Sequence, residues 1–326
     1  MKKHLFNGKT ILVTGGTGSF GKKMIRIVLD EYGPGQMIVY SRDEMKQFMM
    51  QLEFEGYDNL RFVIGDIRDK ERLKEAMRGV DYVVHAAALK IVPSLEHNPS
   101  EAVKTNIIGA MNIIECALDQ KVQKVIALST DKACNPVNLY GATKLCSDKL
   151  FIAANSHTSS GATSFAAVRY GNVVGSRGSV IPFFLEKKKE GVIPITDERM
   201  TRFFITLEQG VRFVLKNFER MLGGEVFVPK IPSMSIIDLA KAVAPDCKIK
   251  IIGIRPGEKL HEIMISADDA RHTIELDDCF VIKPEFSWWD KASHQQANPV
   301  ADEFSYSSNT NKEWLTIPQL HKLIEE

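Results

Sequence analysis

Short apolar runs alternate with longer amphipathic segments through the first half of the chain. The apolar runs predict strands at residues 9–14, 36–40, 60–64, 82–85, 122–128 and 164–169. The amphipathic segments predict helices that end near residue 29 or cover residues 43–55, 69–77, 100–119 and 139–154. Because strands that alternate with helices pair in parallel through right-handed crossovers, we expect an α/β fold with a doubly wound parallel sheet of the Rossmann type.

The pattern changes after residue 169. Residues 170–179 are too rich in glycine for a helix, and residues 193–196 and 200–203 suit short irregular elements. The later segments predict helices at 207–218 and 236–243, strands at 225–228 and 248–254, and a charged loop at 255–259. Residues 287–316 are polar, which suits an extended tail along the surface or partial disorder.

These patterns divide the chain into two expected domains. Residues 1–170 form the Rossmann domain, to which residues 203–229 are expected to return, and residues 171–326 form mainly a smaller domain and the tail. A chain of 326 residues is long enough for about two domains with a sizeable core.

Composition narrows the class of protein. The net charge of +1 gives no sign of a nucleic-acid surface, and the eight histidines lack the spacing of metal ligands. The five cysteines form no CxxC pair and indicate reduced thiols. The N-terminus lacks the pattern of a signal peptide, and no apolar run reaches about 18 residues, so we expect a cytoplasmic protein without a membrane span.

A glycine-rich loop follows the first predicted strand. Its glycines fit G-x-G-x-x-G between a strand and a helix, which is the context of a dinucleotide-binding turn. Glycine lets the backbone approach a pyrophosphate, and the N–H groups at the helix start hold the anion. The expected cofactor-binding residues of this loop are Gly15, Thr17, Gly18, Ser19, Phe20 and Gly21.

The residues after the next strands indicate which dinucleotide binds. Ser41, Arg42 and Lys46 lie where the adenosine ribose is expected, and the two cations suit the 2′-phosphate of NADP. Asp43 keeps NAD open as an alternative. The loops at the carboxyl ends of later strands add further expected cofactor contacts at Asp66, Ile67 and Ala86, and Asp66 is placed to accept from the adenine amine.

One segment carries most of the candidate chemistry. Among the seven tyrosines, only Tyr140 has a lysine four residues later, at Lys144, which places both on one face of a helix. An ammonium beside a phenol favours the phenolate, so we expect a lowered tyrosine pKa and a base for a sugar hydroxyl. Asp131 and Lys132, at the end of the preceding strand, add an acid and a second base. A plain dehydrogenase needs neither.

Several motifs resemble a known family. TGGTGSFG, AAALK and YGATK resemble the extended short-chain dehydrogenases/reductases, which include nucleotide-sugar epimerases and dehydratases. STDKA, RYGNVVGSRGSV, PITDERMTRF and IRPGEKLHE resemble the narrower group of inverting UDP-N-acetylglucosamine 4,6-dehydratases, which open pseudaminic acid synthesis. The resemblance covers nearly the whole chain and implies a tightly held NADP.

The resemblance also implies roles for the candidate residues. Tyr140, helped by Lys144 and Thr130, takes the proton of the sugar 4-hydroxyl while hydride leaves C-4. Lys132 removes the C-5 proton, Asp131 protonates the departing 6-hydroxyl, and Lys132 returns a proton to the opposite face of C-5. Because the nicotinamide, Lys144 and burial would all lower the pKa of Lys132 while Asp131 would raise it, we expect a coupled pair.

Further residues are implied in substrate binding. Lys90 and Asn172 are expected to contact both cofactor and sugar, and the UDP group is expected to lie against Thr196, Arg202, Arg255 and Glu258. Arg199 and Arg177 are weaker candidates for the same role. Relatives form dimers and hexamers, so a homo-oligomer is expected. A UDP-sugar 4- or 5-epimerase and a non-catalytic NADP-binding regulator stay open as alternatives, although a simple 4-epimerase and a regulator have no need of the Asp131–Lys132 pair.

Overall fold

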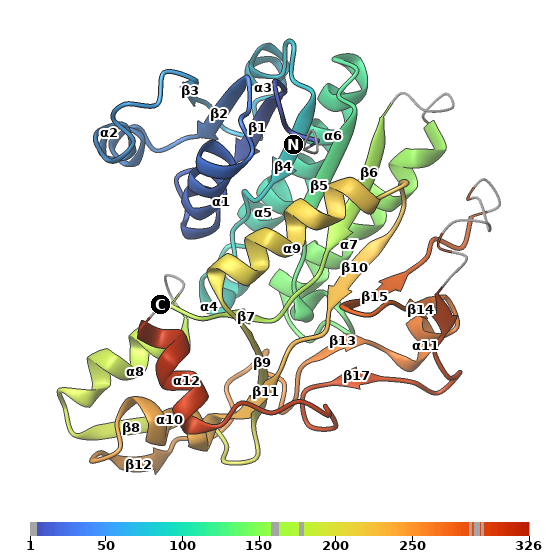
Figure 1. The fold of residues 1–326 in the computed structure, drawn as a ribbon. Coiled ribbons are helices and arrows are strands. Elements are labelled where there is room, and N and C mark those ends of the chain that lie inside the picture. The colour runs from blue at the N-terminus through green and yellow to red at the C-terminus, as the bar shows by residue number, and fades with distance from the viewer. Residues whose placement is uncertain are drawn as a thin grey trace.

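A large sheet forms the centre of the molecule (Figure 1). The computed structural model describes residues 5–157, 163–175, 179–286, 289, 294 and 297–325. Seven parallel strands of the sheet lie in the order β3-β2-β1-β4-β5-β6-β10. They are β1 (Thr10–Thr14), β2 (Gln36–Ser41), β3 (Leu60–Ile64), β4 (Tyr82–His85), β5 (Lys124–Leu128), β6 (Ser164–Val168) and β10 (Val226–Pro229). The predicted Rossmann-type parallel sheet is confirmed.

Helices cover both faces of this sheet because its strands are apolar on both sides. Ile11 and Val13 of β1 pack in one buried cluster with α1 and α9, whereas Leu12 packs in a second cluster with α3, α6 and α7. Successive side chains of a strand point to opposite faces, so one strand contributes to both clusters. The helices are α1 (Ser19–Glu31), α2 (Glu44–Glu53), α3 (Lys70–Ala76), α6 (Gly109–Asp119), α7 (Leu139–Ala154) and α9 (Leu207–Arg220).

One edge of the large sheet is antiparallel, which the sequence patterns did not predict. Beyond β10 lie β15 (Cys279–Ile282), β14 (Thr273–Glu275) and β16 (Asn298–Pro299), each antiparallel to its neighbour. These strands have two to four residues, too few for a period of two to stand out in the sequence.

The helix predicted at residues 100–119 is interrupted. It consists of α5 (Pro99–Ala102), a π-helical turn (Val103–Ile108) and α6, so the prediction of one continuous helix was wrong. A π-turn inserts an extra residue into the helical repeat, and apolar periodicity does not reveal it. The short helices α4 (Val92–His97) and α11 (Ala267–Ala270) were also not predicted, and α8 covers Val180–Lys188.

The remaining elements form a smaller lobe with its own core. Three small sheets have the orders β11-β9-β7, β12-β8 and β13-β17, and Figure 1 shows α8, α10 and α12 gathered near β8 and β12. The elements are β7 (Asn172–Val173), β8 (Val192–Ile195), β9 (Thr201–Ile205), β11 (Ser233–Ser235), α10 (Ile236–Val243), β12 (Lys248–Ile251), β13 (Ile263–Ile265), β17 (Tyr306–Ser307) and α12 (Ile317–Glu325). Two short 3₁₀ turns cover Asp131–Ala133 and Asn155–His157.

The described part of the polar C-terminal segment pairs both with the large sheet and with one of the small sheets. Its strand β16 extends the large sheet, and β17 pairs with β13 in antiparallel order. Ser308, directly after β17, is fully buried. Within the described ranges, no helix is both long and apolar enough to cross a membrane.

Candidate active site

A cleft of about 1190 Å³ runs between the large sheet and the smaller lobe. Its walls include the glycine-rich loop, the carboxyl ends of β2, β4 and β5, and residues of β7, β9 and α8. Ligands of open parallel sheets bind at the carboxyl ends of the strands, where the loops change direction. All the predicted cofactor, catalytic and substrate-binding residues line this one cleft, except the two weaker candidates Arg199 and Arg177.

The glycine loop lets an anionic group approach its backbone closely. Gly15 has a φ of 66°, and a Cβ on it would lie 2.9 Å from the backbone nitrogen of Ala87. A Cβ on Gly21 would lie 2.5 Å from the Cα of Gly16, so a larger residue would push α1 away from the loop. The N-cap of α1, Gly18, offers no side-chain cap, which leaves the helix start open to an anion. These features fit the pyrophosphate of a dinucleotide.

Charged groups gather at the end of the cleft expected to hold adenosine. The Arg42 guanidinium lies 3.7 Å from Asp66 and is more than half exposed. Asp43 accepts from the backbone N–H of Lys46 as the N-cap of α2 and also pairs with its ammonium at 2.6 Å, so helix capping accounts for this carboxylate. Burial would raise the pKa of Asp66, but hydrogen bonds from Arg68 hold it below its ordinary value. The sequence analysis did not single out Arg68.

Tyr140 and Lys144 lie one helical turn apart on α7, as predicted. Asn138 begins this helix by accepting from the N–H of Gly141 at 2.8 Å. Burial raises the pKa of Tyr140 to about 12, with Lys132 and Thr130 acting in the opposite direction. Burial also lowers the pKa of Lys144. The expectation that Lys144 lowers the tyrosine pKa was therefore wrong for the ligand-free protein, because desolvation outweighs the nearby charges.

Asp131 and Lys132 begin the 3₁₀ turn that follows β5. The Oδ1 of Asp131 accepts from the Thr130 hydroxyl at 2.9 Å and from the Lys132 ammonium at 3.0 Å. Asp131 is fully buried, and its Oδ2 has no hydrogen-bond partner among the described residues.

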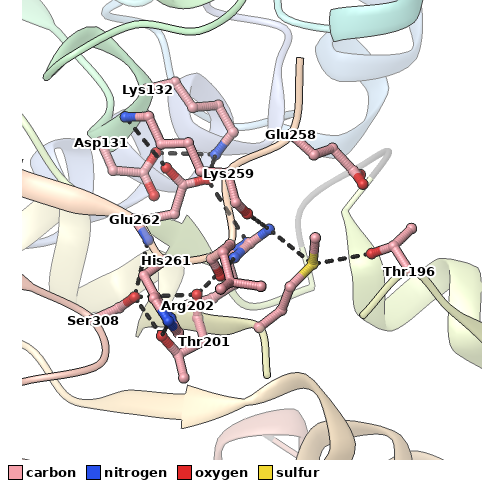
Figure 2. A network of polar contacts seen from close by, with 12 residues as sticks. Asp131, Lys132, Thr196, Thr201, Arg202, Glu258, Lys259, His261, Glu262 and Ser308 are labelled. Carbon is pink, nitrogen blue, oxygen red and sulfur yellow. Dashed lines mark hydrogen bonds and ion pairs between the residues drawn. The ribbon is translucent and has the colours of Figure 1, made fainter. Parts of the chain in front are cut away.

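A second carboxylate, which sequence reasoning missed, faces the same lysine (Figure 2). Glu262 is 3% exposed, and its Oε1 lies 3.4 Å from the Lys132 ammonium. Burial would lower the pKa of Lys132, but Asp131 and Glu262 together raise it above its ordinary value. Burial and Asp131 thus act on the Lys132 pKa in the expected opposite directions, and Glu262 adds to the effect of Asp131. Glu262 closes the IRPGEKLHE motif, but only the fold brings it to Lys132.

The predicted substrate residues lie in the cleft with different partners. Arg202 donates to the carbonyls of Thr201, Lys259 and Leu260 and is largely buried. The contact of Arg202 with the UDP group stays a prediction. The bonds to these three carbonyls already use two of the three guanidinium nitrogens. Arg255 forms an ion pair with Glu258.

The other candidates are placed as follows. Thr196 lies against the sulfur of Met200 at 3.0 Å, and Lys90 and Asn172 line the same cleft as the 131–133 turn. Arg199 forms an ion pair with Asp197 at 2.7 Å. Arg177 lies outside the described residues.

Known proteins resemble this chain over most or all of its length. Residues 11–284 match the family described as "Polysaccharide biosynthesis protein". The chain is 57% identical to a UDP-N-acetylglucosamine 4,6-dehydratase (inverting) of Campylobacter jejuni subsp. jejuni serotype O:2, covering 98% of each protein. It is 44% identical to a UDP-glucose 4-epimerase of Rickettsia akari, covering 83% of this chain and 82% of that protein.

Solved structures extend the comparison. The structure of Pen from Bacillus thuringiensis matches with a TM-score of 0.90 and 39% identity, covering 98% of each chain. The dTDP-glucose 4,6-dehydratase DesIV from Streptomyces venezuelae, solved with NAD and TYD, matches with a TM-score of 0.69 and 23% identity, covering 77% of this chain and 86% of that chain. At that identity the second likeness shows the fold alone.

Proposed function

Since the chain belongs to the Polysaccharide biosynthesis protein family of extended short-chain dehydrogenases/reductases, we propose that it is a configuration-inverting UDP-N-acetylglucosamine 4,6-dehydratase. The product is UDP-2-acetamido-2,6-dideoxy-β-L-arabino-hex-4-ulose, the first intermediate of pseudaminic acid synthesis. One observation carries the proposal: the acid–base pair Asp131–Lys132 lines the same cleft as Tyr140 and Lys144. Loss of water and inversion at C-5 require such a pair in addition to an oxidising site.

The side chains divide the chemistry between them. Tyr140 takes the proton of the 4-hydroxyl, with Lys144 and Thr130 stabilising its phenolate. A nicotinamide cofactor held at the glycine loop would supply an acceptor for the C-4 hydride and a donor of hydride to C-6. The C-4 ketone acidifies the C-5 proton, which Lys132 removes, and Asp131 protonates the 6-hydroxyl so that it leaves as water. Lys132 then protonates C-5 on the opposite face.

The cleft offers groups to hold both ligands. We assign NADP to the glycine loop, with Arg42 and Lys46 facing its 2′-phosphate, because two cations lie where an NAD enzyme places a free carboxylate. Residues of the smaller lobe, which we take to be a substrate domain within residues 171–326, contribute Thr196, Arg202, Arg255 and Glu258 toward the UDP group.

Proton NMR of UDP-N-acetylglucosamine with the purified protein in deuterium oxide tests the proposal. We expect a 6-deoxy-4-keto product with deuterium at C-5 and the L-arabino configuration. The Lys132→Ala variant should keep NADP but lose exchange at C-5, whereas Lys149→Ala, an exposed lysine of α7, should behave as the wild type. Unchanged substrate with and without added NADP would contradict the proposal.

A second candidate function is UDP-sugar 4-epimerisation. Relatives named UDP-glucose 4-epimerase are 43–44% identical over 83–85% of this chain. This similarity favours 4-epimerisation as the alternative function. A 4-epimerase returns the hydride to C-4 and has no need of Asp131 or Lys132. The same NMR experiment separates the two functions, since an epimerase yields a 4-epimer that keeps its C-5 proton and its 6-hydroxyl.

A further inference from the structure

Glu262 is the buried carboxylate of the cleft to which the proposed reaction gives no role. Its Oε1 faces two cations, the Lys132 ammonium at 3.4 Å and the Nε of Arg202 at 3.7 Å. Its Oε2 lies 3.9 Å from the Lys259 ammonium and has no hydrogen-bond partner within the described part of the chain. Glu262 therefore stands between Lys132 and a pair of cations from the smaller lobe (Figure 2).

The backbone of Glu262 is fixed by the C-terminal segment. Its N–H donates to the Ser308 hydroxyl at 3.0 Å, and its carbonyl accepts from the Ser308 N–H at 2.8 Å. The Ser308 hydroxyl also donates to the carbonyl of Thr201, next to Arg202. Ser308 thus joins the strand that carries Arg202 to the loop that carries Glu262 (Figure 2). It lies beyond residue 284, where the family match ends.

The charges around Lys132 indicate separate roles for its two neighbouring carboxylates, Asp131 and Glu262. Lys132 or Glu262 interacts electrostatically with Asp131 of the same turn and with four groups of neighbouring elements, which are Lys90, Tyr140, Arg202 and Lys259. For Asp131 to act as an acid it must carry a proton, which can pass from Lys132 along their 3.0 Å hydrogen bond. That transfer frees the amine but removes the charge from its nearest partner, leaving Glu262 as the ionised carboxylate beside it.

We propose that Glu262 is a positioning residue for the C-5 base Lys132, and that Ser308 holds it there. In the elimination, the C-5–H bond breaks and an N–H bond forms on Lys132. The freed electron pair moves into the sugar and expels the 6-hydroxyl, which takes the proton of Asp131 and leaves as water. Lys132 ends as a cation and Asp131 as an anion, while Glu262 keeps its charge and faces the amine throughout. The inference rests on the proposed dehydratase function.

The pH dependence of Lys132 acylation by acetic anhydride, read by mass spectrometry, tests the charge contact without requiring activity. Glu262→Gln keeps the shape of the side chain but removes its charge, so Lys132 should lose its proton more readily. We expect the midpoint of acylation to move at least about one pH unit lower. Glu225→Gln is the matched control, because Glu225 is a fully buried carboxylate that accepts from the N–H groups of Leu222 and Gly223, outside the cleft. An unchanged or higher midpoint in Glu262→Gln would overturn the inference.

Ser308→Ala tests the positioning by the C-terminal segment. It removes the hydroxyl bonds to Glu262 and Thr201 but no charge, so kcat for water loss should fall about tenfold or more while KM changes less than about twofold. Ser305→Ala is the control, since that hydroxyl donates to the carbonyl of Ile265 instead. An unchanged kcat in Ser308→Ala would refute the role of Ser308. If the wild type forms no 6-deoxy-4-keto sugar, the dehydratase proposal fails, and the acylation midpoint still decides whether Glu262 acts on Lys132.

Discussion

Gly141→Ala should displace the catalytic turn, because the site has no room for a methyl group. Gly141 lies in the first turn of α7, and a Cβ there would lie 2.1 Å from the carbonyl oxygen of Lys132 and 3.0 Å from its carbonyl carbon. Ordinary contacts begin near 3.4 Å, so α7 and the 131–133 turn would have to separate by about 1 Å. The two carbonyl atoms are backbone, and the third obstructing atom, the Cβ of Pro136 at 3.0 Å, belongs to a rigid ring, so no side-chain rotation relieves the clash.

The size of the effect follows from two opposing contributions. Forcing a methyl group into a packed site costs roughly 1–3 kcal/mol, and a backbone clash of this depth belongs at the upper end. Alanine in place of glycine within a helix returns about 1 kcal/mol. We therefore expect a net loss of about 2 kcal/mol of unfolding free energy. A shift of Lys132 by about 1 Å should lower kcat for dehydration by about a hundredfold.

Urea denaturation and the NMR assay measure the two effects, and the chain offers a matched control. Gly210 lies in α9, where a Cβ would find its nearest neighbour at 3.9 Å, the Cδ1 of Ile205. Gly210→Ala should therefore leave activity unchanged and raise stability by up to about 1 kcal/mol. If Gly141→Ala proved as stable and as active as Gly210→Ala, the close packing of α7 on the catalytic turn would be refuted.

Three further predictions concern the cofactor, the proposed base and the core beneath it. Arg42→Gln should raise the dissociation constant of NADP about tenfold or more but change that of NAD little, and calorimetry showing equal changes for both would contradict a 2′-phosphate contact. Because burial raises the pKa of Tyr140 to about 12, this phenol is protonated at pH 7, and bound NADP, with its positive nicotinamide, should lower the pH at which it ionises. The phenolate absorbance that Tyr140→Phe removes measures this midpoint, and an unchanged midpoint with saturating NADP would count against the assignment. Asp148→Asn should cost about 3 kcal/mol of unfolding free energy, since it removes the nearer of the two carboxylates that face the buried Arg169, at 3.4 Å, and leaves only Asp269 at 3.7 Å, whereas Asp268→Asn, at an exposed ion pair, should leave Tm unchanged.

Local patterns predicted the part of the molecule in which neighbours in sequence are neighbours in space. Five of the six early strands are apolar runs that are largely buried, whereas the edge strand β3 is partly exposed, and the glycine loop lies between a strand and a helix. Tyr140 and Lys144 share a helical turn, and Asp131 and Lys132 are adjacent in the chain. Their spacing alone places them together once the local element forms.

The tertiary structure decided what depends on contacts between distant segments. The antiparallel edge strands are too short to show a pattern, and the pairing of β15 with β10 and of the edge strands with one another supplies the hydrogen bonds that stabilise them. The pKa of Tyr140 rises because the fold buries it, an effect that local spacing to Lys144 does not contain. Glu262 reaches Lys132, and Ser308 reaches Glu262, across 130 and 46 residues of sequence. A motif names the residue types available to a site, but burial and the approach of separate segments set their charges and partners.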